Sequence, residues 1–325
     1  MSVKTVDDEF TRIIGALTRR GFLTGAAALG GLGLLSACST ATSDASAEDT
    51  VEITVDGKSY HIPRDPKRVV VLEARGALDF SLLAGYPIAA TNWDDKSQLM
   101  SRVPSGTPRL GGTNIEPNAE SILSYEPDLL VVGQGWWDYY QEKGLLGTDI
   151  APVLVVDLGT PDSQWKAAMV GQLEALDRKD VADRVVAEYD SQIVVSREKI
   201  GGLLDGKTIV IAGADDAEFW IQNDQFVGSV ARDLGLNVLT VPPRSPEDTE
   251  YATFYGLEEL EVFDQADFIL LQNPDSIGTE SATWQRVRAV RDGHVGELRY
   301  DLNNGLALTA IALAADLAEK VQVMR

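Results

Sequence analysis

Five short apolar runs, each ending at a glycine or a polar turn, set the strongest limit on how this 325-residue chain can fold. They read RVVVLEARG, PDLLVVGQG, PVLVVDLG, KTIVIAGADD and ADFILLQNP, all between residues 68 and 274. Continuous apolar runs are typical of strands buried on both faces, as in a parallel sheet covered by helices. Longer helical patterns separate the runs, so the order favours an α/β fold of the doubly wound type.

A charged segment at about residues 178–201 interrupts this alternation. It contains no strand pattern, its apolar residues form an uneven helical stripe, and Gly201-Gly202 closes it. At 1.5 Å per residue, a helix of about 21 residues spans roughly 30 Å, the diameter of a small domain. We predict a strut that joins two lobes, at about 51–165 and about 203–325. The alternative is a long helix on the surface.

The stretch TRRGFLTGAAALGGLGLLSAC, Thr18 to Cys38, indicates export from the cytoplasm. Its arginine pair resembles the twin-arginine signal, and the apolar run that follows has about 13 residues, too few to span a bilayer. Leu35-Ser36-Ala37-Cys38 resembles a lipobox, after which the signal peptide (1–37) is removed and the cysteine is lipidated. Residues 38–50 are rich in Ser, Thr and Ala, which predicts a flexible tether. We expect a lipid-anchored protein on the outer face of the cytoplasmic membrane.

The composition narrows the possible partners. A formal net charge of −22 argues against nucleic acid, because affinity for nucleic acid depends on neutralising phosphates. Cys38 is the only cysteine, so no disulfide can hold the fold together. A hydrophobic content of 44% is that of a globular protein, and we expect it to be a monomer.

Several longer strings carry a family resemblance. The lead-in YHIPRDPKRVVVLEARGALDFSLLAGYPI and the unit LGGTNIEPNAESILSYEPDLLVVG belong to the first predicted lobe. FVGSVARDLGLNV, YGLEELEVFDQADFILL and WQRVRAVRDGHVGEL follow in the second. In this order they resemble the ferric-siderophore and cobalamin class of ABC-transporter substrate-binding proteins, over about residues 60–323.

The resemblance implies a fold and a function. Members of the class have two Rossmann-like lobes joined by one long helix, with the ligand cleft between the lobes. A member would be a lipid-anchored receptor that captures an iron(III)-siderophore and delivers it to an ABC permease and its ATPase. Binding of heme or cobalamin on the same fold, or a non-transport role in contacting other envelope molecules, stays open as an alternative.

The sequence offers little for catalysis or direct metal binding. It has two histidines, one in each predicted lobe, whereas a transition-metal receptor needs several imidazoles and a carboxylate at one site. Neither a phosphate-binding glycine loop nor a G-x-S-x-G nucleophile elbow is present. We therefore expect no enzyme, no catalytic residues, no resident metal and no cofactor.

The candidate ligand contacts lie where predicted strands end. Arg75 follows the first strand, and its guanidinium suits chelate oxygens; an ion pair with Glu73 or Asp79 is the alternative. Large aromatic side chains suit a bulky organic chelate, although some would pack between helix and sheet. The aromatic candidates are Trp93, Trp136, Trp137 and Tyr139 in the first lobe, and Phe219 and Phe226 in the second.

Three further features refine the expectation. Heme-binding members carry a tyrosine where this chain has Gly112, which removes an axial ligand there. Asp215, Asp216 and Glu218 stand where many siderophore receptors place arginine, so we expect a neutral, cationic or lipophilic ligand such as a ferric hydroxamate. Glu120 and Glu258 begin what we predict to be equivalent helices, and the resemblance makes them the residues that dock on the permease. Their alternative role is to stabilise a helix N-terminus.

Overall fold

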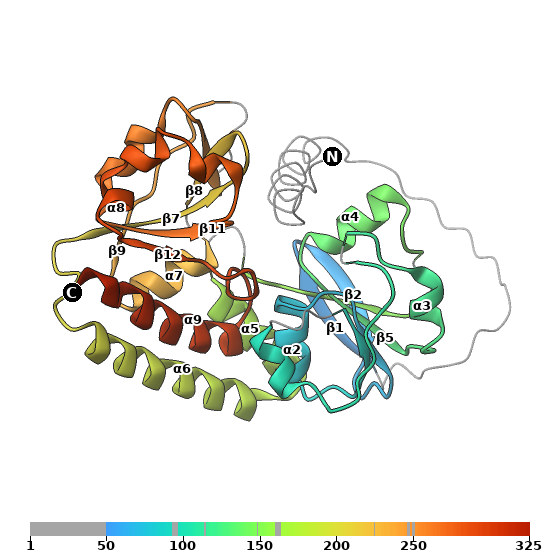
Figure 1. The fold of residues 1–325 in the computed structure, drawn as a ribbon. Coiled ribbons are helices and arrows are strands. Elements are labelled where there is room, and N and C mark those ends of the chain that lie inside the picture. The colour runs from blue at the N-terminus through green and yellow to red at the C-terminus, as the bar shows by residue number, and fades with distance from the viewer. Residues whose placement is uncertain are drawn as a thin grey trace, which may run out of the picture.

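The computed structural model describes residues 50–92, 97–113, 115–147, 149–159, 164–223, 225–245, 248 and 251–325. These residues form two α/β lobes joined through the long helix α6, Lys179–Ile200 (Figure 1). The expected fold class is therefore confirmed. Among the helices of this described part, none is long and apolar enough to cross a membrane.

Lobe 1 contains a four-stranded parallel sheet in the order β4-β3-β5-β6. The short, fully apolar strands account for the parallel pairing, because helices cover the sheet. Its strands are β3 Val69–Val71, β4 Ile88–Thr91, β5 Leu129–Gly133 and β6 Val153–Val156. Its helices are α2 Gly76–Leu83, η1 Gln98–Arg102, α3 Ala119–Leu123 and α4 Trp136–Lys143.

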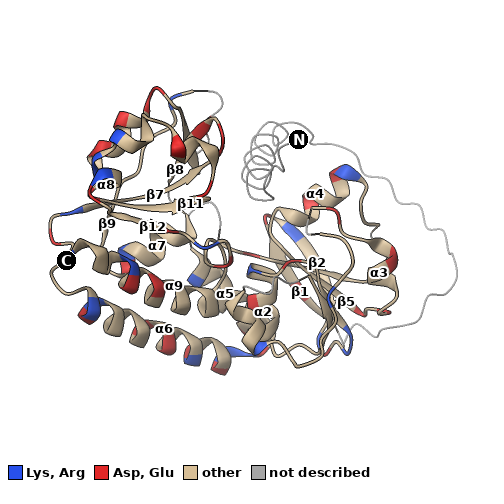
Figure 2. Ribbon diagram, in the orientation of Figure 1, with Lys and Arg blue, Asp and Glu red and all other residues tan. Residues whose placement is uncertain are grey.

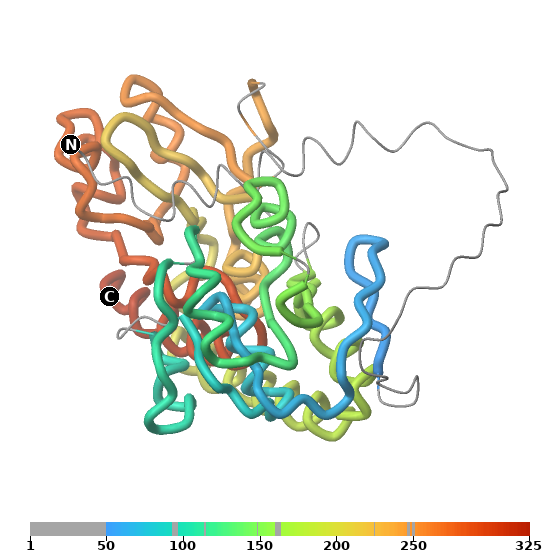
Figure 3. Tube along the Cα trace, turned by 90° about the vertical axis from the view of Figure 1, so that its right-hand side faces the viewer, coloured from blue at the N-terminus to red at the C-terminus, as the bar shows by residue number. Residues whose placement is uncertain are grey.

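A separate hairpin precedes the lobe 1 sheet. Strands β1 Thr50–Val55 and β2 Lys58–Pro63 pair antiparallel and join neither main sheet. Asp56 and Gly57 connect them with φ of 50° and 72°, as a two-residue hairpin turn requires. The hairpin packs against β6 and stands as an arm at the side of lobe 1 (Figure 3).

Lobe 2 is mixed rather than wholly parallel. The strands follow the order β10-β8-β7-β11-β12, with β9 paired to the start of β7, and β8 and β10 run antiparallel to their neighbours. The strands are β7 Thr208–Ala214, β8 Glu218–Gln222, β9 Asn237–Val238, β10 Ala252–Gly256, β11 Phe268–Gln272 and β12 Val295–Glu297. The helical segments are α7 Phe226–Asp233, η2 Leu260–Gln265, η3 Ile277–Glu280, η4 Trp284–Arg286, α8 Arg288–Arg291, η5 Tyr300–Leu302, α9 Ala307–Lys320 and η6 Val321–Met324.

The reversal after β7 has a local cause. Asp215 Oδ1 accepts hydrogen bonds of 2.8 Å from the backbone N–H groups of Ala217 and Glu218. This side-chain turn sends the chain straight back as β8, a strand that is not among the five apolar runs. Phe219 therefore lies within a strand and not at the end of one.

One continuous hydrophobic core links the lobes. Helix α6 lies beside α9, and buried side chains of both helices join the apolar residues of the lobe 1 sheet, α5 (Trp165–Ala175) and α7 in a single cluster. A second cluster fills the other face of the lobe 2 sheet. The helix predicted as a strut therefore packs along its length as part of the core, as does the last helix of the chain.

Candidate functional site

The carboxyl edge of the lobe 1 sheet presents polar and aromatic side chains near lobe 2. Glu73 and Arg75 follow β3, and Gln134 and Trp136 follow β5. In open α/β sheets, ligands bind beyond this edge of the strands.

Arg75 makes contacts with both lobes. The side chain is 3% exposed and lies at the start of α2, with its Nε 3.4 Å from Glu73 Oε1. Its Nη1 donates a 2.8 Å hydrogen bond to Asn303 Oδ1, and its guanidinium carbon lies 4.5 Å from the centre of the Tyr300 ring. Tyr300 and Asn303 belong to the connection between β12 and α9. A cation from lobe 1 is thus held against an aromatic face from lobe 2.

Glu73 holds this arginine in place. Its two carboxylate oxygens accept the backbone N–H groups of Arg75, at 2.6 Å, and Ala77, at 2.9 Å. The carboxylate therefore stabilises the N-terminus of α2 as well as the guanidinium. Glu73 and Asp79 were the two expected ion-pair partners of Arg75, and the structure shows the pair with Glu73. A contact between Arg75 and ligand stays a prediction.

Three aromatic residues of α4, Trp136, Tyr139 and Tyr140, form a group of rings next to this ion pair. Gly135, with φ of 82°, turns the chain from β5 into the helix, and the rings that follow are buried. The Trp136 ring centre lies 5.8 Å from that of Tyr139 and 6.0 Å from that of Tyr140. Burial raises the pKa of Tyr140 well above its usual value, and the charge of Glu73 raises it further. The Tyr140 hydroxyl group is therefore neutral.

We call this group the inter-lobe cluster and define it by seven residues. They are Glu73, Arg75, Trp136, Tyr139, Tyr140, Tyr300 and Asn303.

A second contact fixes the lobes to each other behind the cluster. Asp79 of α2 is fully buried, and its carboxylate accepts backbone N–H groups of Leu306 and Thr309, each at 2.9 Å, and of Leu308, at 3.2 Å. These donors form the N-terminus of α9, where a carboxylate is favoured. Burial raises the pKa of Asp79, while the hydrogen bonds from α9 lower it.

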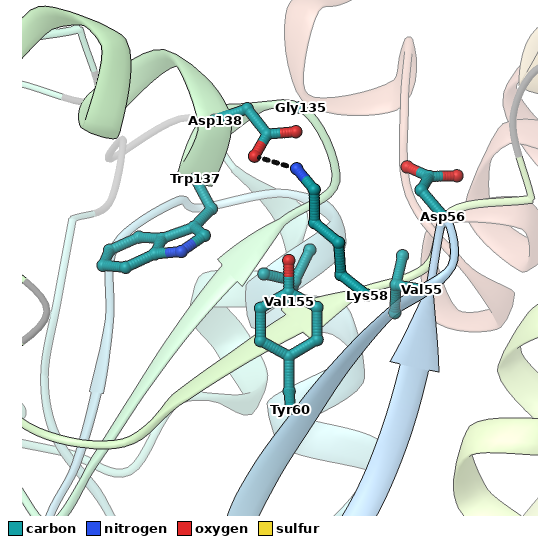
Figure 4. Close-up of a pocket in the computed structure, with 8 residues that line it drawn as sticks. All are labelled: Val55, Asp56, Lys58, Tyr60, Gly135, Trp137, Asp138 and Val155. Atoms are coloured by element: carbon teal, nitrogen blue, oxygen red, sulfur yellow. Dashed lines mark hydrogen bonds and ion pairs between the residues drawn. The ribbon is translucent and has the colours of Figure 1, made fainter. Parts of the chain in front are cut away.

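The remaining aromatic candidates do not join the inter-lobe cluster. Trp93 lies outside the described residues. Phe219 is fully buried in the lobe 2 core, stacked on Trp284 with ring centres 4.6 Å apart. Phe226 begins α7 and packs edge-on against Trp165 at 5.8 Å. Trp137 is buried on the side of α4 that faces the hairpin (Figure 4).

The two predicted docking glutamates are exposed, but their local structures differ. Glu120 lies in the first turn of α3. Glu258 lies in a turn before the 3-10 helix η2, so the expectation of an equivalent helix start there is wrong. The reason is Glu259, whose carboxylate accepts the N–H of Gly256 at 3.2 Å and pairs with Arg244 at 3.0 Å, which fixes that turn. Cys38, the predicted lipidation site, lies outside the described residues.

Within the described part of the chain, no group of three or more His, Cys, Asp or Glu side chains is arranged to hold a metal ion. The inter-lobe cluster offers instead one cation, one carboxylate and several rings. Such a set can contact an organic molecule that has apolar faces and a few exposed oxygen atoms.

Tyr300 and Asn303 were not among the predicted site residues. Both occur in RYDLNNGL, which follows the last strand at its carboxyl end. The sequence feature that could have identified them is the one that selected Arg75: a polar or aromatic residue shortly after a strand. The short strand β12 made it harder to recognise.

Known proteins with related sequences and folds were compared with this chain. The family model described as periplasmic binding protein matches residues 69–302, from β3 to η5. The iron(3+)-hydroxamate-binding protein FhuD of Bacillus subtilis is 26% identical over 83% of this chain and 85% of that protein. The probable siderophore-binding lipoprotein YfiY of the same organism is 25% identical over 62% of this chain and 63% of that protein.

Among solved structures, the siderophore-binding protein FhuD of Vibrio cholerae, bound to Fe3+-Desferal, has the same fold. Its TM-score is 0.61 at 21% identity, over 79% of this chain and 98% of that chain.

Proposed function

The chain belongs to the periplasmic binding protein family, and on this premise we propose that it captures an iron(III)-siderophore outside the cytoplasm and delivers it to an ABC importer. The family is one of binding proteins rather than enzymes. The curated relatives named for iron-hydroxamate and siderophore binding support the class of ligand.

One observation in the structure carries the proposal. Arg75 is held between the lobes against the ring of Tyr300, and Tyr140 of α4 interacts with both Glu73 and Tyr300. Rings provide large apolar contact surfaces with little loss of side-chain entropy, which suits a bulky chelate. The guanidinium can donate hydrogen bonds to oxygen atoms that coordinate the iron. We place the ligand at the inter-lobe cluster, with Arg75, Trp136 and Tyr139 as contacts.

The charge around the site favours a hydroxamate over a catecholate. Acidic positions gather around β8 in lobe 2 (Figure 2), including Asp215, Asp216 and Glu218. A strongly anionic tricatecholate complex would be repelled by these carboxylates, whereas a neutral or cationic ferric hydroxamate would not. The name of the FhuD relative agrees with this choice.

The surroundings of Gly112 argue against heme bound in the manner expected of the heme-binding members. Gly112 has φ of 85°, and a Cβ atom there would lie 2.4 Å from the carbonyl oxygen of Glu116. An axial tyrosine would therefore require the backbone to move.

Fluorescence titration tests the ligand. The protein lacking its lipid would be titrated with a ferric hydroxamate, a ferric tricatecholate and ferric citrate, and tryptophan quenching would be followed. We expect the hydroxamate to bind most tightly, and Arg75→Ala to weaken it at least tenfold. The proposal fails if the tricatecholate binds most tightly or if no ferric chelate binds.

We further propose that Glu120 and Glu258 dock on the two permease subunits. Both carboxylates are exposed, one in each lobe. Reversing both charges should abolish iron uptake by cells and leave chelate affinity unchanged. The matched control reverses two exposed carboxylates of α6, Glu188 and Glu198. Normal uptake by the Glu120→Lys/Glu258→Lys variant would remove the assignment.

We also propose that Cys38 carries the lipid and that residues 1–37 are removed. The lipoprotein named among the relatives supports an extracytoplasmic, membrane-anchored location. Cys38→Ser should move the protein from the membrane fraction to the soluble fraction, and its retention in the membrane would contradict this. We expect a monomer, which light scattering of the lipid-free protein would check.

A further inference from the structure

We propose that the tip of the β1–β2 hairpin, Val55–Lys58, positions α4 and thereby sets the affinity of the inter-lobe cluster for its ligand. Asp56 and Lys58 are then positioning residues, which act through α4. The inference rests on the proposed function, because α4 carries the rings proposed to contact the chelate.

Two polar contacts join the hairpin tip to the start of α4. Lys58 Nζ lies 2.6 Å from Asp138 Oδ1 in the first turn of the helix (Figure 4). Gln134 Nε2, directly before the helix, donates to both carboxylate oxygens of Asp56, at 3.0 and 2.8 Å. Gln134 Oε1 also accepts the backbone N–H of Leu158 at 3.1 Å. The tip is thus tied to α4 and, through Gln134, to the edge of the sheet.

The first turn of helix α4 has buried rings but no side-chain N-cap. It has eight residues, and its N-cap is Gly135, which has no side chain to accept the free backbone N–H groups. Asp138 supplies the negative charge that the helix N-terminus favours, and Lys58 is the cation that holds Asp138.

The proposed ligand contacts lie on both sides of the held residue. Trp136 lies two residues before Asp138 and Tyr139 directly after it, so a shift of Asp138 moves both rings. Trp137 and Tyr60 line the same cavity of about 10 Å³, room for about one water molecule (Figure 4). Because this space is small, Trp137 limits how far α4 can move towards the hairpin.

The contact is near the surface, which makes it separable from folding. The side chains of Lys58 and Asp138 are 55% and 44% exposed, and exposed ion pairs contribute little to global stability. The hairpin also joins neither main sheet. Changes at its tip should therefore alter the position of α4 more than they alter the unfolding of the lobes.

The test compares ferric-hydroxamate affinity, by tryptophan quenching, across matched variants. We expect Lys58→Ala to raise Kd about threefold and Asp56→Ala/Lys58→Ala about tenfold, with melting temperatures close to that of the wild type. The charge swap Lys58→Asp/Asp138→Lys should recover most of the affinity that Lys58→Asp loses. Lys179→Ala is the control, because its 2.8 Å ion pair with Asp183 is similarly exposed but lies on α6.

Hydrogen exchange provides a readout that needs no ligand. In Lys58→Ala, backbone amides of the first turn of α4 should exchange several times faster, whereas those of α2 should not change. If no chelate binds the wild type, the proposed function fails, and the exchange data alone decide whether the tip holds α4. Unchanged exchange in α4, or a Kd within twofold of wild type for the double variant at Asp56 and Lys58, would overturn the inference.

Discussion

Replacing Asp79 by asparagine should destabilise the contact between the lobes while keeping the side chain's size. In the wild type, Oδ2 accepts two backbone N–H groups of α9 and Oδ1 accepts a third. An asparagine can place its carbonyl oxygen at only one of these positions. Its NH2 group then faces the N–H of Leu308, which loses its acceptor inside the protein.

The size of the effect follows from these contacts. A buried donor left without an acceptor costs about 1–3 kcal/mol. Removing the negative charge also loses its attraction to the helix N-terminus, up to about 2 kcal/mol in buried geometries. This loss is partly offset, because the burial that raises the pKa of Asp79 disfavours its charged form. We expect Asp79→Asn to lower the free energy of unfolding by about 1–3 kcal/mol. Asp79→Ala should cost more, because all three donors lose their partner.

Urea unfolding, followed by tryptophan fluorescence and circular dichroism, measures this loss. The matched control is Asp128→Asn. The Asp128 carboxylate also accepts two backbone N–H groups, those of Lys67 and Arg68, but it lies near the surface and within one lobe. The control should cost less than about 1 kcal/mol, since water can replace the lost acceptor. Hydrogen exchange should show the Asp79 effect at the N-terminus of α9.

Two results would refute this reasoning. One is an Asp79→Asn variant as stable as the control. The other is a loss of stability with no faster exchange at Leu306, Leu308 and Thr309, which would mean that the substitution acts somewhere other than at the junction of the lobes.

Other predictions follow from single contacts. Burial and the charges of Asp138 and Asp56 raise the pKa of Tyr60 to about 12. The contribution of this group to stability is therefore complete below pH 10 and is lost as pH rises through 12. Tyr60→Phe should remove that part of the alkaline loss of stability, measured by urea unfolding at a series of pH values. Phe219→Leu should lower the free energy of unfolding by about 1–3 kcal/mol and leave chelate affinity unchanged, because the ring packs in the lobe 2 core. Weaker chelate binding at unchanged stability would instead mean that Phe219 contacts the ligand. Gly112→Ala should also lower the stability of the protein, since the new Cβ atom would clash with the Glu116 carbonyl oxygen. A melting temperature equal to that of the wild type would show that the clash does not occur.

Much of the fold could be predicted from the pattern of apolar runs. Strands β3, β5 and β6 of lobe 1 and the helix α6 follow directly from their sequences, because continuous apolar runs and a charged helical stripe have few other solutions. Strands β8 and β10 escaped prediction. Their antiparallel pairing depends on the turn made by the Asp215 side chain, and a periodicity argument does not register such a turn.

The site was partly predictable for a similar reason. Arg75 and Trp136 follow strands at the carboxyl edge, and that rule selected them. Phe219 was selected by the same rule, but it lies within the unpredicted strand β8, so the ring belongs to the core and not to the edge. Tyr300 and Asn303 reach Arg75 only because the chain returns from lobe 2 to lobe 1, which depends on tertiary structure.

The shared core has a consequence for the order in which the chain can fold during synthesis. Domains generally fold as units, with the N-terminal one first. Here the first lobe contains Asp79, whose three donors lie more than 220 residues later in the chain. While the ribosome is still adding lobe 2, that carboxylate and the apolar side of α2 have no partner from α9. The first lobe should therefore remain incomplete until the last helix leaves the ribosome, and the two lobes should reach their final form together.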